Sequence, residues 1–123
     1  MYIWERIMNP PKITEICKLH DLLVEAGIQH EYLDRRQQFD PDGLIKDMGF
    51  DHDYGWQIVV YDEDGRRIIS AIEGFGTYGV ESDRIEIMGL LTKEESKYDC
   101  VLGGLTAEEV FERIKKAEGV VFA

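Results

Sequence analysis

Residues 56–72 read WQIVVY, DEDGR and RIISAI, and this stretch carries the clearest structural signal in the sequence. Two runs rich in β-branched and aromatic residues, Trp56–Tyr61 and Arg67–Ile72, flank a polar segment that contains Asp62-Glu63-Asp64-Gly65. Glycine stands where a tight turn needs a positive φ angle, so the pattern is typical of a β-hairpin. We therefore expect the two runs to pair as antiparallel strands.

A strand is also expected on each side of this hairpin. Ile28–Asp34 alternates weakly between apolar and polar residues, and Arg84–Leu91 alternates at its start. With the hairpin, these segments predict a small antiparallel four-stranded meander. One face of such a sheet has to be covered by other elements.

Two main helices are available as the cover. Asn9 suits an N-cap, Pro10 suits the first helical position, and Gly27 suits a helix end, so one helix is expected over Asn9–Ala26. The other is expected over Thr106–Ala117, which opens with a capping box. The fold class predicted is therefore α+β, in the order α-β-β-β-β-α.

A second capping box, Thr92-Lys93-Glu94-Glu95, predicts a short helix that ends before Gly103-Gly104. The length of 123 residues suits a single domain, 1–123. Its two cysteines, Cys17 and Cys100, form no CxxC motif, which is typical of reduced thiols inside a cell. No apolar run reaches the length of a membrane span, so we expect a cytoplasmic protein without a membrane partner.

The charge is strongly acidic, with a formal net charge of −11. A surface of this sign repels nucleic-acid backbones and anionic membranes, so we expect no nucleic-acid partner. A small nucleotide is not excluded, because a pocket can be locally basic within an acidic protein.

The sharpest motif is Gly74-Phe75-Gly76-Thr77-Tyr78-Gly79. As G-x-G-x-x-G it fits neither a dinucleotide fold, which needs a βαβ unit, nor a protein kinase, whose companion motifs are absent. Its backbone N–H groups can still cup an anion, with the Thr77 hydroxyl as a further donor and two aromatic rings to stack on a base. The alternative interpretation is a tight, bulged connection between two strands.

Arginines are expected at the strand ends, where Arg35-Arg36 closes the first strand, Arg66-Arg67 opens the third and Arg84 opens the fourth. Such a cluster can hold a phosphate bidentately, although surface ion pairing is the alternative for each of them. The predicted ligand-binding residues are Gly74, Phe75, Gly76, Thr77, Tyr78, Gly79, Trp56, Arg35, Arg36 and Arg84.

Catalysis has no positive support in the sequence. Asp51-His52-Asp53 looks like a metal ligand set, but adjacent residues rarely converge on one ion, and nothing at helical or hairpin spacing completes it. His20 lies on the apolar face of the first helix and is interpreted as a core histidine. We therefore expect no enzyme, no metal site and no cofactor.

The phrases LHDLLVEAGIQHEYLDRR, GWQIVVYDEDG, GFGTYG, RIEIMGLLTKEES and LTAEEVFERIKKA lie between about Leu19 and Ala117. In these phrases the chain resembles a family of small uncharacterised proteins encoded by phages and prophages of Firmicutes. The resemblance implies a phage accessory protein that acts against host defence, and it carries over no catalytic residue.

Two functions stay open. The first is a sponge for a nucleotide-derived host immune signal, such as a cyclic ADP-ribose isomer or a cyclic oligonucleotide. It would be a homo-oligomer joined through the apolar ends Tyr2–Ile7 and Val120–Phe122. The second is an acidic inhibitor that binds a host defence protein, a nuclease or a CRISPR effector, by mimicking nucleic acid.

Overall fold

The computed structural model describes residues 14–35, 55–73 and 83–123. Within these ranges the chain forms a five-stranded antiparallel sheet, in the order β1-β2-β3-β4-β5, and three helices. In chain order the elements are α2 (Glu15–Glu25), β1 (Glu31–Asp34), β2 (Trp56–Tyr61), β3 (Arg67–Glu73), β4 (Ile85–Met88), α5 (Lys93–Ser96), β5 (Val101–Leu105) and α6 (Ala107–Lys116). The α+β class is confirmed.

The central hairpin is confirmed as predicted. β2 and β3 pair antiparallel along their length. In the turn between them, the carboxylate of Asp62 accepts hydrogen bonds from the backbone N–H groups of Asp64 and Arg66, both at 2.9 Å. Gly65 has a φ angle of 78°, which is the conformation that favours glycine at this position.

The expected number of four strands is wrong, because β5 follows α5 and pairs with β4. The sequence marks Gly103-Gly104 only as the limit of a short helix, and glycine weakens a strand, so no strand was expected there. The neighbouring strand explains one of the two glycines, since a Cβ at Gly103 would lie 3.2 Å from the side chain of Glu86. Gly103 therefore has a low intrinsic preference for a strand, but it leaves space for the Glu86 side chain on β4.

Two strands are shorter than predicted. β1 covers only part of the expected range 28–34, and β4 covers only part of 84–91. β4 ends where Gly89 and Leu90 adopt positive φ angles of 106° and 56°, which turn the chain out of the extended conformation.

The residues before β1 pair instead with the C-terminal segment. Ile28 forms an isolated antiparallel bridge with Phe122. The Gln29 N–H donates to the Val121 carbonyl, and the Ala123 N–H donates to the Gly27 carbonyl, both at 2.7 Å. The apolar segment 120–122 thus packs on the chain in part, while the Phe122 side chain is 68% exposed.

The helices begin at threonine caps. α2 begins at Glu15, with the Thr14 hydroxyl accepting from the Cys17 N–H at 3.3 Å, rather than at the predicted Asn9. Residues 9–13 lie outside the described ranges. Both predicted capping boxes are present, at Thr92 for α5 and at Thr106 for α6.

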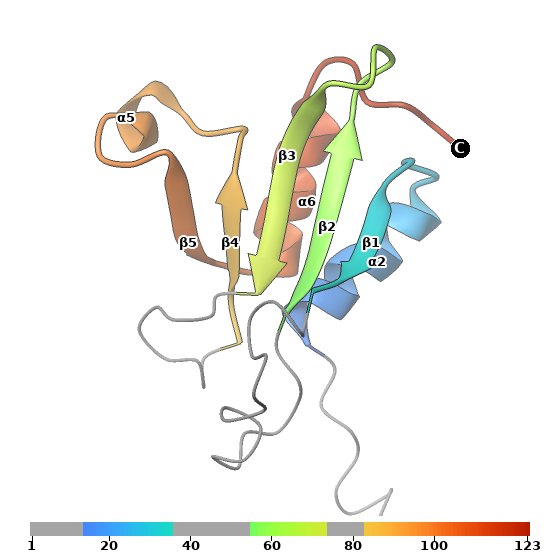
Figure 1. Ribbon diagram of the computed structural model, residues 1–123, viewed down its shortest axis with the longest axis horizontal. Coiled ribbons are helices and arrows are strands. Elements are labelled where there is room, and N and C mark those ends of the chain that lie inside the picture. Colours follow the sequence, from blue (N-terminus) through green and yellow to red (C-terminus); the bar gives the residue numbers. More distant parts are fainter. Residues whose placement is uncertain (1–13, 36–54, 74–82) are drawn as a thin grey trace, which may run out of the picture.

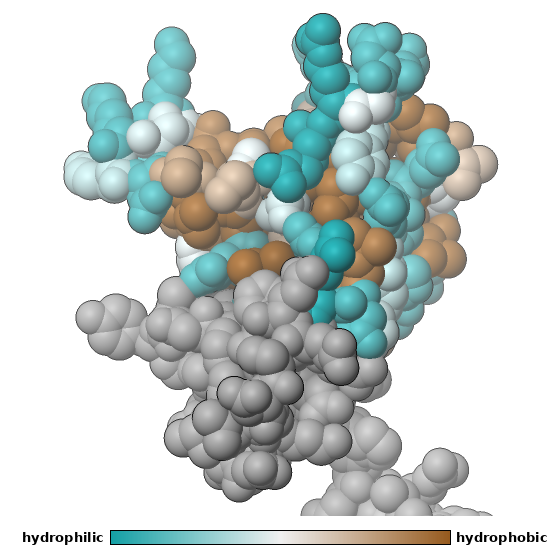
Figure 2. Space-filling view, viewed as in Figure 1, coloured by the Kyte–Doolittle hydropathy of each residue, from teal (hydrophilic) through white to brown (hydrophobic). Residues whose placement is uncertain are grey.

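α2 and α6 contact each other and pack on one face of the sheet, as predicted (Figure 1). The core between helices and sheet consists of Ile16, Leu19, Leu23, Ile28, Ile58, Val60, Ile69, Ala71, Ile85, Ile87, Leu105, Ala107, Val110 and Ile114. The opposite sheet face is covered by none of the described helices. Figure 2 shows apolar side chains among hydrophilic ones over this face, and Met88 there is 44% exposed.

Candidate functional site

Three strand ends meet at one end of the sheet (Figure 1). The Arg35 N–H, just after β1, donates to the carbonyl of Gly55, just before β2, at 2.8 Å. The Gly55 N–H in turn donates to the carboxylate of Glu73, the last residue of β3, at 3.1 Å. Glu73 is buried, at 2% exposure, so its hydrogen bond with Gly55 is shielded from solvent.

Most of the predicted ligand-binding residues lie outside the described ranges. They are Gly74, Phe75, Gly76, Thr77, Tyr78, Gly79 and Arg36. Gly74 directly follows Glu73 in the chain, so the glycine-rich motif begins next to the junction of the three strand ends. Its anion-binding role stays a prediction.

Arg35 and Trp56 are neighbours at this end but point to opposite faces of the sheet. The Trp56 ring packs against Tyr32, with 4.8 Å between ring centroids, on the face covered by α2. The Arg35 guanidinium lies on the open face, where its Nε–H donates to the Gln57 side chain at 3.1 Å. Sequence reasoning grouped the two residues by position along the strands and missed the alternation of their side chains.

Arg84, the third described residue of the predicted set, stands just before β4. Its guanidinium donates to the Asp83 carbonyl at 3.2 Å and lies near enough to Glu15 to favour the charge of that carboxylate. The structure thus places Arg84 beside the start of α2, and Arg35 beside the start of β2.

Buried acids cap both main helices at the same end. The Asp83 carboxylate accepts the Glu15 N–H, the first of α2, at 3.1 and 3.3 Å. The Glu15 carboxylate accepts the Ala107 N–H, the first of α6, at 2.9 Å. The partial positive charges at the two helix N-termini therefore offset the charges of these carboxylates. Any net positive potential at this end of the sheet has to come from cationic side chains.

Sequence reasoning missed a chain of rings that runs between α2 and the sheet. His20 on α2 stacks on Tyr32 of β1 at 4.3 Å between centroids, and Tyr32 in turn meets Trp56. On its other side, His20 Nδ1 lies 2.8 Å from Nε2 of His30. The only signal in the sequence was two histidines on neighbouring elements, which does not predict their contact.

The hydrogen bonds of the two histidine rings indicate which ring nitrogens carry protons. His30 Nδ1 lies 2.8 Å from the carbonyl of Ile28, and a carbonyl only accepts, so this nitrogen carries a proton. In a neutral His30 the Nε2 atom therefore accepts, and His20 Nδ1 donates to it. Burial lowers the pKa of His20, and the neighbouring His30 lowers it further. Burial also raises the pKa of Tyr32 to about 12, so the phenol stays protonated.

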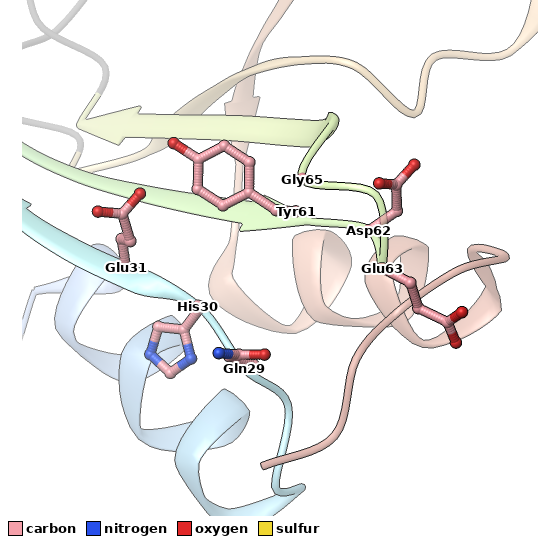
Figure 3. Close-up of a pocket in the computed structure, with 7 residues that line it drawn as sticks. All are labelled: Gln29, His30, Glu31, Tyr61, Asp62, Glu63 and Gly65. Carbon is pink, nitrogen blue, oxygen red and sulfur yellow. The ribbon is translucent and has the colours of Figure 1, made fainter.

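A cavity of about 430 Å³ lies at the opposite, hairpin-turn end and is lined by Gln29, His30, Glu31, Tyr61, Asp62, Glu63 and Gly65. Figure 3 shows the Tyr61 ring and the Glu31 carboxylate on one side of the sheet edge, and the His30 ring on the other, toward α2. A hydrogen bond with Glu31 raises the pKa of Tyr61. Three carboxylates in the lining make this cavity a poor phosphate site.

The thiols and the acids show no catalytic arrangement in the described parts of the chain. Burial raises the pKa of Cys17, which disfavours the reactive thiolate. Within residues 14–35, 55–73 and 83–123, no group of three His, Cys, Asp or Glu side chains is placed to hold a metal ion. None of the helices in these ranges has the length and apolar character needed to cross a membrane.

Comparison of the chain with protein-family models, with curated proteins and with solved structures finds no match.

Proposed function

We propose that this chain is a phage-encoded, non-enzymatic binding protein that sequesters a nucleotide-derived host immune signal in the cytoplasm of the infected cell. The ligand class is a cyclic ADP-ribose isomer or a cyclic oligonucleotide. One observation carries the proposal: Arg35, Gly55 and Glu73 join three strand ends at the point where the glycine-rich motif begins. Binding residues are often found in loops that follow the ends of strands.

The chemistry of this end suits a phosphate-bearing molecule with a base. Arg35 and Arg84 supply guanidinium groups, which bind phosphate oxygens through paired N–H donors. Trp56 packs on Tyr32 on the opposite face from Arg35. Base stacking is therefore assigned to the predicted Phe75 and Tyr78, which lie outside the described residues. Stacking on such a ring contributes about 1–3 kcal/mol in single-strand binders. The carboxylates of Asp83 and Glu15 are occupied by the helix N-termini, which reduces their repulsion of an anion.

The test is a thermal denaturation series with purified protein and a panel of cyclic dinucleotides, cyclic trinucleotides and ADP-ribose isomers. A ligand that binds only the folded state adds about 2.7 kcal/mol of stability at a hundredfold excess over Kd. Linear nucleotides and inorganic phosphate are the controls for non-specific anion effects. Equal melting temperatures across the whole panel at millimolar ligand would contradict the proposal.

A second candidate function is an acidic inhibitor of a host defence nuclease or CRISPR effector. The observation that favours it lies at the hairpin-turn end, where Glu31, Asp62 and Glu63 surround an open cavity on a chain of net charge −11. Such a surface is attracted to the basic groove of a nucleic-acid-binding protein. Inhibition of a purified effector that weakens with Glu63→Lys and with added salt, without nucleotide binding, would favour this function over the first.

A further inference from the structure

The His20–His30 pair can hold only a limited number of protons. In the neutral pair, one proton lies on His30 Nδ1 and one lies between the rings, with a lone pair on the facing nitrogen to accept it. A first added proton still leaves one lone pair between the rings. A second removes it, so that two N–H groups with like charge face each other across 2.8 Å and the bond is lost.

The bond between the rings connects α2 to the segment that anchors the C-terminal residues. His30 donates to the carbonyl of Ile28, while the flanking Gly27 carbonyl and Gln29 N–H hold Ala123 and Val121. Residues 27–29 are therefore held both by the His30 ring, through Ile28, and by the C-terminal segment, through Gly27 and Gln29. Loss of the ring contact leaves this short, irregular segment held by fewer bonds.

The groups around His20 oppose its protonation more than they favour it. From α2, Asp21 favours a charge on His20, and Cys17 is a protonated thiol. Tyr32 of β1 stacks on His20 as a neutral phenol, and Trp56 of β2 packs against Tyr32. Glu31, Asp62 and Glu63 line the cavity beside His30, with Tyr61. Burial and the paired imidazole outweigh Asp21 at His20.

We propose that the His20–His30 pair is a proton-operated latch for the C-terminal segment. At neutral pH the latch fastens residues 27–30 to α2 and keeps residues 121–123 docked. In acid, each ring takes one proton from solvent, the rings separate, and the segment with its C-terminal partner loosens. Opening uncovers Ile28, which is 4% exposed in the closed state.

The sign of the effect follows from the direction of the pKa shift. Because the pKa of His20 is lowered in the folded chain, the closed state binds protons less readily than a chain with separated rings. The latch is therefore fully present above the ordinary pKa of histidine and is weakened as the pH falls below it. This device involves neither the strand-end arginines nor the glycine-rich motif, so it stands independently of the proposed ligand.

The test is amide hydrogen exchange by NMR on the full chain at several pH values from about 8 to about 5, the range in which histidine titrates. The intrinsic pH dependence of exchange is divided out. We expect the protection of the Gln29 amide to fall about tenfold in acid, the size expected for one lost hydrogen bond with like-charge repulsion. The amides of the central strand β3 should keep their protection, which separates latch opening from global unfolding.

His20→Asn is the informative variant, because its side-chain amide reaches the position of Nδ1 and can either donate to or accept from His30. It does not titrate, so the protection of Gln29 should become independent of pH. His52→Asn removes the third histidine of the chain and should leave the wild-type pH dependence intact.

Three results would overturn the latch. One is pH-independent protection of Gln29 in the wild type, and another is unchanged pH dependence in His20→Asn. The third needs no variant: ring ¹⁵N shifts of the wild type at about pH 8 should report the Nδ1–H form of His30. Finding the Nε2–H form there would exclude the proposed bond pattern even if the variant fails to fold.

Discussion

Both carboxylate oxygens of Asp83 accept the backbone N–H of Glu15, at 3.1 and 3.3 Å. Glu15 plays the same part for α6, because its own carboxylate accepts the first N–H of that helix. The same carboxylate pairs with Lys18 at 2.8 Å. Asp83 adopts a positive φ of 50° to reach this position, which costs a residue with a Cβ some strain. Asp83 thus binds the N-terminus of α2, and Glu15 of α2 binds the N-terminus of α6.

Glu15→Gln is expected to lower the free energy of unfolding by about 2 kcal/mol near neutral pH, the usual size of a charged hydrogen bond lost from a buried site. Burial raises the pKa of Glu15, but the hydrogen bonds from Lys18 and Ala107 outweigh it, so the pKa is lowered. The stabilisation is therefore present above the ordinary glutamate pKa and is lost as the pH falls through the lowered value. Urea unfolding at several pH values measures it.

The matched control for that prediction is Glu112→Gln on α6, whose ion pair with Lys115 is exposed to solvent. It should change stability little at any pH. If the two variants lost the same stability, or if the gap between Glu15→Gln and the wild type stayed constant in acid, the capping role of Glu15 would be refuted.

Gly89→Ala is expected to destabilise the fold by about 3 kcal/mol, the sum of left-handed strain and a steric clash. A Cβ at Gly89 would collide with the carbonyl oxygen of Ile68 on β3. Gly27→Ala is the control, because Gly27 also has a positive φ, of 71°, but a Cβ there meets nothing within 4 Å. Its cost should be only about 1 kcal/mol. Equal melting temperatures for the two variants would show that the clash is relieved by local movement.

Gly76→Val is expected to abolish binding of any ligand that the thermal series identifies, because a β-branched side chain blocks close approach to loop N–H groups. Gly76 lies outside the described residues, so this prediction rests on the sequence. Arg84→Gln should weaken binding, whereas Arg67→Gln at the hairpin-turn end should leave it unchanged. Titration calorimetry gives the three affinities. Full affinity in Gly76→Val would place the ligand elsewhere.

Phe122→Ser should shift the chain toward a monomer if the apolar ends mediate the expected self-association. Phe122 is 68% and Val24 57% exposed, and large exposed apolar patches are rare on monomers. Tyr98→Ser is the control, since Tyr98 is 86% exposed and follows the C-cap of α5. Figure 1 shows α5 on the other side of the sheet from the C-terminus. Sedimentation velocity distinguishes the states. A wild type that stays monomeric at high concentration removes the basis for this interface, whose other predicted part, Tyr2–Ile7, lies outside the described residues.

The parts of the fold that sequence predicted are those with local causes. The hairpin at Gly65 and the capping boxes at Thr92 and Thr106 depend on residues within a few positions of one another. β5 was missed because its Gly103 is favoured by a contact with Glu86 on another strand, which no local pattern reveals. The start of the first helix was predicted at Asn9 because Asn9-Pro10 suits an N-cap and first helical position, whereas the structure caps α2 at Thr14.

The candidate site was less predictable for the same reason. Sequence position correctly brought Arg35 and Trp56 to one end of the sheet, but whether they share a face depends on the exact strand register. The His20–His30 bond depends on how α2 packs against β1, and two histidines ten positions apart carry no trace of it. Long-range geometry, rather than residue type, decided each of these cases.

The acid-to-helix contacts also order events during synthesis and folding. Asp83 lies 68 residues beyond Glu15, and Ala107 lies 92 residues beyond it, so both contacts close long loops. An isolated helix of 11 residues such as α2 is marginal in water, and loop closure costs entropy before a contact returns it. Before the second half of the chain is made, α2 has its Thr14 cap but lacks both the Asp83 carboxylate and the helix whose first N–H Glu15 accepts. We therefore expect the β2–β3 hairpin, whose contacts are local, to form early and the helical layer to pack on the sheet last.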